Sequence, residues 1–135
     1  MNMRGDVRQI IEAVSGWQAV SATPHRFGGT EFQVGKVEIG HIHHNGMVDI
    51  PFTVKTRRAL VAEGAAEVHH LLSESGWISY YLQRGGSADH ALRLYQLSYL
   101  HKRSRRTEVV NYADAIAALG FGAAVSASVG ADGEA

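Results

Sequence analysis

The stretch TEFQVGKVEIGHIHHNGMVDIPF, residues 30–52, decides the fold because its apolar residues recur with a period of two. Such alternation is typical of β-strands that have one buried face. Gly35-Lys36 and Asn45-Gly46 interrupt the pattern, and both pairs suit two-residue hairpin turns. The sequence therefore predicts a three-stranded antiparallel meander over residues 30–52.

The two turns also predict a register for the meander. Phe32 is expected to face Ile39, and His41 to face Thr30 on one side and Ile50 on the other. Residues that face each other across antiparallel strands lie on the same side of the sheet. We therefore expect His41 and His43 on the apolar face, which packs on the core. The opposite face is expected to carry Glu31, Gln33, Glu38, His44 and Asp49.

The segments outside the meander predict three helices and another strand. Apolar residues at helical spacing over 7–14 indicate an amphipathic helix. Thr53 and Ser87 suit the caps of two further helices, which end near residues 64 and 99. Aromatic and β-branched residues over 77–82 indicate a strand. The predicted fold class is α+β, with an antiparallel sheet of four to five strands and helices packed on one face.

The composition is that of a globular domain without cysteine chemistry. The chain has 135 residues, of which 45% are hydrophobic and 19% charged, with a net charge of +0 and no cysteine. Disulfides and thiolate sites are therefore excluded. The neutral balance argues against nucleic-acid or membrane binding through bulk charge. No apolar run approaches the ~18–20 residues of a membrane span, and the N-terminus has no signal-peptide core, so we expect a cytoplasmic protein.

The composition changes towards the C-terminus. We expect residues 1–103 to form a single α+β domain and residues 104–135 to form a C-terminal extension. Within the extension, residues 112–119 suit a short helix. Residues 120–135 are mostly Gly, Ala and Ser, which predicts a disordered tail because little apolar surface is available for burial.

Histidines are the first candidates for chemistry, since the chain has eight. His41 and His43, two apart on a strand, point the same way and can both reach one divalent metal ion. A third ligand would come from His25, His69 or His70. The predicted register places Glu31 on the other face, so we discount it. The alternative is a pair of half-buried histidines that hydrogen-bond to the backbone.

Three other segments carry polar groups that suit a binding site. In residues 24–29, Arg26 can hold an anion beside His25, although a tight turn explains the same residues. His69-His70 lie close to Trp77, and either imidazole can act as an acid or base near neutral pH. The alternative is a hydrogen-bonded loop. The basic run 102–106 suits either nucleic acid or the C-terminal end of a helix dipole.

Together these motifs resemble a known family. The segments PHRFGGTEF (24–32), GHIH (40–43), DIPF (49–52), His69-His70 and SGW (75–77) resemble the bacterial and fungal luciferase domain family over about residues 16–101. The resemblance implies a functional pocket and no particular reaction. According to this resemblance, the signature stretches of the family contain His25, Arg26, Glu31, His41, His43 and His70. The order of elements is also similar to the small α+β YjbR-type fold.

Two functional hypotheses stay open. In the first, the chain is a small-molecule enzyme with a histidine-rich pocket, in which His41, His43 and His70 are catalytic and His41 and His43 hold a divalent metal if one binds. Its substrate would be held by Arg26, His25 and Trp77. In the second, the chain is a non-catalytic protein- or nucleic-acid-binding module with structural histidines. The first requires the histidines to converge in a concave site, and the second requires a filled core and a basic patch.

Overall fold

A six-stranded antiparallel sheet forms the centre of the protein, in the order β1-β2-β3-β4-β6-β5. The computed structural model describes residues 3–25 and 28–131. The strands are β1 (Val20–Pro24), β2 (Thr30–Val34), β3 (Val37–Ile42), β4 (Met47–Pro51), β5 (Glu67–Val68) and β6 (Trp77–Tyr81). The predicted α+β class is confirmed, with more strands than expected because β1 precedes the meander and the two-residue β5 adds an edge.

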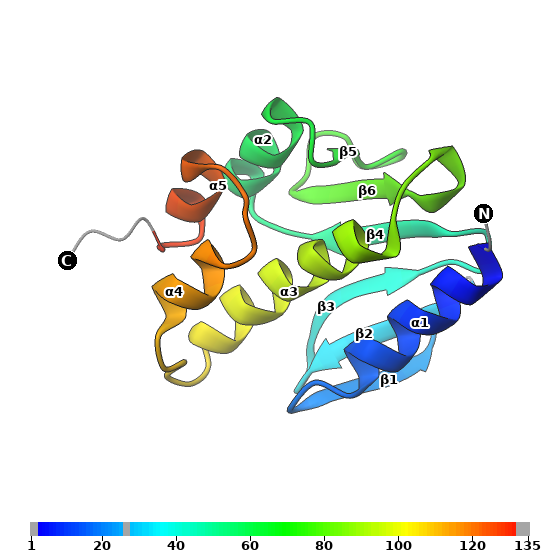
Figure 1. Cartoon of the computed structure of the whole chain (residues 1–135), viewed down its shortest axis with the longest axis horizontal. Coiled ribbons are helices and arrows are strands. Elements are labelled where there is room, and N and C mark those ends of the chain that lie inside the picture. Colours follow the sequence, from blue (N-terminus) through cyan, green and yellow to red (C-terminus); the bar gives the residue numbers. More distant parts are fainter. Residues whose placement is uncertain (1–2, 26–27, 132–135) are drawn as a thin grey trace.

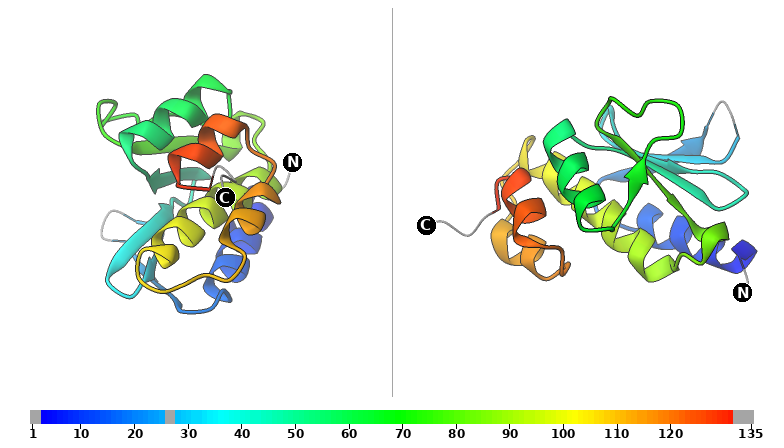
Figure 2. Two further views of the ribbon diagram at one scale, coloured as in Figure 1. Left: turned by 90° about the vertical axis from the view of Figure 1, so that its left-hand side faces the viewer. Right: turned by 90° about the horizontal axis from the view of Figure 1, so that it is seen from above.

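Helices surround this sheet, and two of them cover one face (Figures 1 and 2). The helices are α1 (Met3–Ser15), α2 (Val54–Ala62), α3 (Ala88–Ser104), α4 (Tyr112–Ala117) and α5 (Ala123–Ser128), with a 3-10 turn η1 (Leu82–Arg84). α1 and α3 lie side by side on the sheet. The predicted caps are present, since Thr53 accepts from the Thr56 N–H and Ser87 from the His90 N–H, both at 3.1 Å. No helix in the described ranges has the length and apolar character to cross a bilayer.

The β3–β4 hairpin has a three-residue loop, 44–46, instead of the predicted two-residue turn. His43 N–H donates to the Met47 carbonyl at 2.9 Å, and His41 pairs with Asp49. Gly46 has a φ of +91°, which suits the left-handed position of a three-residue loop. The Asn45-Gly46 pair predicted the position of the turn correctly, but the predicted length of two residues was wrong. One residue of slip exchanges the faces of a strand, so the prediction that His41 and His43 lie on the apolar face is wrong.

A β-bulge at Ile39 changes the pairing of β2 with β3. Gln33 pairs with Glu38, but the next residue, Phe32, pairs with Gly40, so Ile39 is the extra residue. The predicted Phe32–Ile39 and Thr30–His41 pairs are wrong for this reason. A bulge re-aims the side chains that follow it. Glu38 and His41, three residues apart, thereby reach the same face, and Glu31, which we discounted, pairs with His41 there.

Gly40 makes room for the buried ring of Tyr95. Its φ is +148°, and a Cβ atom at this position would lie 2.7 Å from Cε1 of Tyr95. The Tyr95 ring also packs edge-on against Phe32, with centroids 5.4 Å apart. Its hydroxyl donates to the His41 carbonyl oxygen at 2.8 Å. Tyr95 therefore fixes the position of β3 from the core side, directly behind the His41 side chain.

The C-terminal region is ordered beyond the predicted short helix. We expected a disordered tail over 120–135, but the structure has α5 there, and Val125 and Val129 are buried in the core. The Tyr112 hydroxyl donates to the Val129 carbonyl at 2.8 Å, and Thr56 of α2 bonds to Ser128 at 2.8 Å. Alanine is the strongest helix former, so an Ala-rich segment with two apolar anchors folds. Residues 132–135 lie outside the described part of the chain.

Truncation of a buried side chain in α5 tests whether this segment contributes to stability. Val125→Ala is expected to lower the free energy of unfolding by about 2 kcal/mol, because it removes buried methyl groups and leaves a cavity. The matched control is Val110→Ala, since Val110 is 80% exposed. Its effect should stay within about 0.5 kcal/mol. Urea unfolding measures both, and equal effects would mean that α5 does not pack as described.

A second pair of variants tests the Gly40–Tyr95 contact. Gly40→Ala combines an unfavourable φ with a clash against Tyr95, and should lower the free energy of unfolding by about 3 kcal/mol. Gly64→Ala has a φ of +78° with nothing within 4 Å of the added Cβ. This variant should lower the free energy of unfolding by only about 1 kcal/mol, because alanine is disfavoured in the left-handed backbone conformation. Chemical denaturation measures the free energy of unfolding of both variants. The extra loss in Gly40→Ala reports the contact with Tyr95, and equal losses in the two variants would contradict this contact.

Candidate functional site

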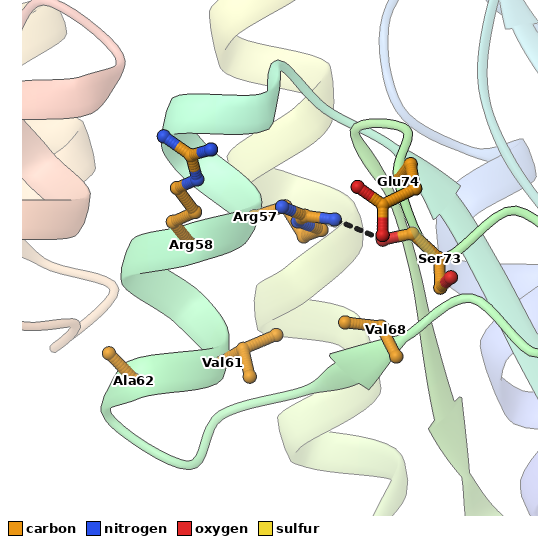
Figure 3. A pocket seen from close by; sticks show the side chains of 7 residues that line it. All are labelled: Arg57, Arg58, Val61, Ala62, Val68, Ser73 and Glu74. Carbon is orange, nitrogen blue, oxygen red and sulfur yellow. Dashed lines mark hydrogen bonds between the residues drawn. The ribbon is translucent and has the colours of Figure 1, made fainter.

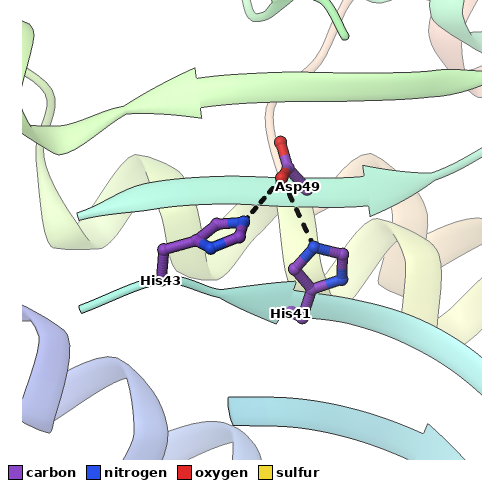
Figure 4. Close-up of side chains that lie close together, drawn as sticks. All are labelled: His41, His43 and Asp49. Atoms are coloured by element: carbon purple, nitrogen blue, oxygen red, sulfur yellow. Dashed lines mark hydrogen bonds and ion pairs between the residues drawn. The ribbon is translucent and has the colours of Figure 1, made fainter. Parts of the chain in front are cut away.

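Asp49 lies at the centre of a cluster of histidines on the sheet face opposite α1 and α3. Its side chain is 1% exposed, and its Oδ1 accepts from the Ser79 hydroxyl at 2.6 Å. Four imidazole Nε2 atoms surround its Oδ2, at 3.0 Å (His43), 3.3 Å (His41), 3.6 Å (His70) and 3.7 Å (His69). Figure 4 shows His41 and His43 of β3 and the following turn pointing at Asp49 of β4.

Strand pairing explains how these residues meet. His41 of β3 pairs with Asp49 of β4, and Asp49 pairs with Ser79 of β6. Paired residues share a face, so the three side chains form a row across the sheet. His43 lies two residues after His41 and therefore joins the same face. The cluster thus follows directly from the three-residue turn, since a two-residue turn would have put Asp49 and the histidines on opposite faces.

His41 lies between two carboxylates. Its Nδ1 contacts Oε2 of Glu38 at 2.7 Å, and its Nε2 faces Asp49. Burial lowers the pKa of His41, but hydrogen bonds and charges of Asp49 and Glu38 outweigh it and raise the pKa to about 9. Burial raises the pKa of Asp49. Hydrogen bonds from His41, Ser79 and His43 outweigh burial and hold this pKa well below its usual range. Both side chains are therefore charged at neutral pH, and a cation that binds Nε2 of His41 has to displace the proton of that nitrogen.

The loop after β5 supplies the other two histidines. Nδ1 of His69 accepts from the backbone N–H groups of Leu71 and Leu72, both at 3.1 Å. A nitrogen that accepts carries no proton, so a neutral His69 carries its proton on Nε2, towards Asp49. Burial lowers the pKa of His69 although Asp49 opposes this, which favours the neutral form. His70 stacks on His69, with ring centroids 4.2 Å apart.

Arg57 of α2 holds this loop in place. Figure 3 shows its guanidinium directed at the loop, where Nη1 donates to the Ser73 carbonyl oxygen. Arg58, the next residue, points away from the loop in the same view. The hollow between α2 and the loop is lined further by Val61, Ala62, Val68 and Glu74. Arg57 therefore links α2 to the segment that carries His69 and His70.

The cluster opens into a cavity of about 490 Å³, which we call the histidine pocket. Its lining residues are His25, Glu38, His41, His43, Asp49, His69, His70, Leu71, Leu72 and Trp77. His25 stacks on His41 at 4.1 Å, and Trp77 lies 5.5 Å from His41 between ring centroids. Leu71, which is 79% exposed, forms part of an apolar rim. A polar floor with an apolar wall, at this volume, is typical of small-molecule sites.

The structure brings together most of the residues that the sequence singled out. His25, His41, His43, His70 and Trp77 all line the histidine pocket. Arg26 lies outside the described residues. The cluster is thus concave, as the pocket hypothesis requires, and the histidines do not lie in a filled core.

Sequence reasoning missed two acidic residues and one hydroxyl. Asp49 and Glu38 were assigned to the face opposite His41, because the predicted turn was one residue too short and the bulge at Ile39 was not foreseen. The signal for Asp49 was present, since it begins the DIPF segment. Ser79 had no signal of its own, because its role depends on pairing between β4 and β6.

Two overlapping groups in this cluster have the composition of metal sites. One consists of His41, His43 and Asp49, and the other of Asp49, His69 and His70. In each group the ligand atoms lie within 4.8 Å of one another. Asp49 belongs to both groups, so its carboxylate is the residue on which any bound cation would depend.

Comparison with known proteins found one family model that matches part of the chain. A family model described as Luciferase domain matches residues 36–98. This range contains the cluster from Glu38 to Ser79 and is narrower than the predicted 16–101. No curated protein and no solved structure matches the chain. The predicted resemblance to the luciferase domain family is therefore confirmed for residues 36–98, which run from the β2–β3 turn into α3.

Proposed function

We propose that this protein is a small-molecule enzyme whose histidine pocket binds one divalent transition-metal ion through Nε2 of His41, Nε2 of His43 and Oδ2 of Asp49. The observation that carries the proposal is the convergence of four imidazoles on one carboxylate oxygen. An oxygen of this kind has about two lone-pair sites for hydrogen bonds. Four nitrogens around it exceed what a purely structural carboxylate needs, whereas a cation would use at least two of them as ligands.

The separations between the donor atoms suit one metal ion. Zinc–nitrogen and zinc–oxygen bonds of about 2.0–2.2 Å place neighbouring ligand atoms about 2.8–3.1 Å apart in octahedral geometry and about 3.3–3.6 Å apart in tetrahedral geometry. The Nε2–Oδ2 separations are 3.0 Å for His43 and 3.3 Å for His41. Two imidazoles and a carboxylate, without thiolate, suit zinc, iron(II) or a similar ion.

Residues outside the ligand set orient it. Glu38 contacts Nδ1 of His41, which leaves Nε2 as the atom available to a cation. A carboxylate behind a metal-binding histidine is the usual outer-shell arrangement, and it raises the basicity of the ligand. Ser79 similarly donates to Oδ1 of Asp49, so that Oδ2 is directed at the histidines. Both ligands therefore have defined orientations before an ion binds.

The hydrogen bonds of His69 favour the first ligand group over the second. Because Nδ1 of His69 accepts two backbone N–H groups, its Nε2 keeps the proton and has no lone pair for a metal. His70 has no such restriction in the described contacts, but it belongs to the second group only, so its side chain would have to move to become a fourth ligand. The proposed set of three leaves positions open towards the cavity, as in catalytic rather than structural metal sites.

The rest of the pocket supports a small organic ligand. A metal ion at such a site polarises an oxygen of the ligand or activates a bound water. His25 and Trp77 flank His41 with aromatic surfaces, and Leu71 and Leu72 add an apolar rim. We infer a substrate with a flat or apolar body and at least one oxygen that can approach the ion.

Calorimetric titration of tag-free protein with Zn²⁺ tests the proposal, with Co²⁺ absorption as a report on coordination. The wild type should bind one ion per chain. Asp49→Asn, which keeps the shape, and His43→Ala should each weaken binding by more than about 100-fold, beyond the 10–100-fold typical of outer-shell changes. His70→Ala should weaken it by about tenfold or less.

The matched control is His44→Ala, one residue from His43 but exposed on the turn. Its metal affinity should equal that of the wild type, and circular dichroism checks that every variant is folded. Failure of the wild type to bind an ion, or equal losses in His43→Ala and His44→Ala, would contradict the metal site and favour structural histidines.

The role of Glu38 can be tested separately. Glu38→Gln keeps an acceptor for Nδ1 of His41 but removes the negative charge, and should weaken Zn²⁺ binding by about tenfold without changing the stoichiometry. Glu67→Gln is the control, because the Glu67 side chain is 59% exposed and forms an ion pair with Arg84 at 3.7 Å, away from His41. An unchanged affinity in Glu38→Gln would show that Glu38 does not tune the ligand.

A further inference from the structure

A second cavity, of about 520 Å³, lies at the C-terminal end of α3 and is lined mostly by basic and apolar side chains. We call it the α3 cavity. Its lining residues are Val37, Pro51, Phe52, Thr53, His101, Lys102, Arg105 and Arg106. Among the residues that the structure describes, none lines both this cavity and the histidine pocket, and none that lines the α3 cavity is acidic. The charges of Lys102, Arg105 and Arg106 therefore face a common space without a neutralising carboxylate.

Lys102 is the innermost of these basic groups. Its ammonium donates to the Pro51 carbonyl oxygen and, at 2.8 Å, to the Ser98 hydroxyl. An ammonium has three donors, so one N–H remains beyond these two bonds. Burial lowers the pKa of Lys102 to about 8, although the charge of Glu38 opposes this. An anion in the cavity would restore the charged form and accept from the third donor.

The surrounding charges add to the positive potential. Burial and the positive charges of Lys102 and Arg105 lower the pKa of His101. The guanidinium of Arg106 lies against Gly35, where a Cβ atom would come within 2.7 Å of its Nη2. The ion pairs formed within residues 3–25 and 28–131 involve none of Lys102, Arg105 and Arg106. Their positive charge is therefore available to a ligand.

The helix dipole alone does not explain this arrangement. Basic side chains at the end of a helix are favourable when they lie in solvent. Arg103 fits that explanation, since it points away from the cavity, with its guanidinium 5.6 Å from the Tyr99 ring centroid. Lys102 does not, because it is largely withdrawn from water and lies under the Phe52 ring at 5.7 Å. A lysine in such a place needs a partner of opposite charge.

We propose that the α3 cavity binds a small molecule that carries a phosphate or sulfate group. A doubly negative oxyanion matches the charges of Lys102, Arg105 and Arg106 better than a single carboxylate does. Val37, Pro51 and Phe52 provide an apolar wall for the organic part of such a molecule. The site is separate from the proposed metal site, because the two cavities have different lining residues, although the charge of Glu38 acts on Lys102.

Titration with inorganic phosphate and with sulfate, at constant ionic strength set with chloride, tests the site by calorimetry or by thermal shift. The wild type should bind either anion saturably. Arg105→Gln and Arg106→Gln, at exposed positions that do not threaten folding, should each weaken binding by about tenfold. Lys102→Met, which keeps the apolar stem, should abolish it.

Arg103→Gln is the matched control, because it removes the same charge from the same helix on the side away from the cavity. It should leave binding of the anion unchanged. Equal losses in Arg103→Gln and Arg105→Gln would mean that only bulk charge acts, and would overturn the proposal. The same conclusion would follow if an RNA oligonucleotide bound while inorganic phosphate did not.

Chemical labelling provides a second measurement that does not depend on a variant. The chain has three lysines, Lys36, Lys55 and Lys102. The aldehyde of pyridoxal 5′-phosphate forms an imine with a lysine amine and releases water, and borohydride reduces the imine to a stable amine. Peptide mass spectrometry should find Lys102 labelled first and protected by inorganic phosphate. Labelling spread equally over the three lysines would contradict an anion site here.

Discussion

The buried carboxylate of Asp49 is the interaction on which the arrangement of this site depends. A carboxylate that is 1% exposed is costly to bury unless charged and hydrogen-bonding partners surround it. Ser79 satisfies one oxygen, and the histidines surround the other. Because these partners come from β3 and the turn after it, from β6 and from the loop after β5, one carboxylate on β4 draws together segments that are more than thirty residues apart. The contacts that stabilise the charge of Asp49 are thus the same contacts that hold these segments together.

Two local irregularities in the backbone place the histidines opposite the core. The three-residue turn at 44–46 sets the register of β3 with β4, and the bulge at Ile39 brings Glu38 onto the face of His41. Tyr95 then fixes this strand from the other side, through the space left by Gly40 and a hydrogen bond to the His41 carbonyl. The rigid core of α3 and the sheet therefore defines where the imidazoles lie.

The sequence was sufficient to predict most helices and strands, but it did not predict the exact register in which the strands pair. Apolar period and cap residues located the first helix, the caps at Thr53 and Ser87, and the meander, because these signals are local. The register was wrong because an Asn-Gly pair fits loops of two and of three residues, and only tertiary packing chooses between them. Asp49 was lost from the predicted site for that reason, and Glu38 was lost because the bulge at Ile39 was not foreseen. The helix α5 was missed because alanine was counted as weakly apolar instead of as a strong helix former.

The alternation of core and site residues along β3 and β4 has a consequence for how this protein can change during evolution. Ile42 and Ile50 face the helices, whereas His41 and Asp49 face the pocket. Substitutions on one face leave the other face intact, so the chemistry of the pocket can diverge on a constant scaffold. Insertion or deletion of a single residue in either strand would instead exchange the two faces, placing a carboxylate in the core and isoleucines in the pocket. The β3–β4 pair therefore tolerates point mutations but does not tolerate insertions or deletions.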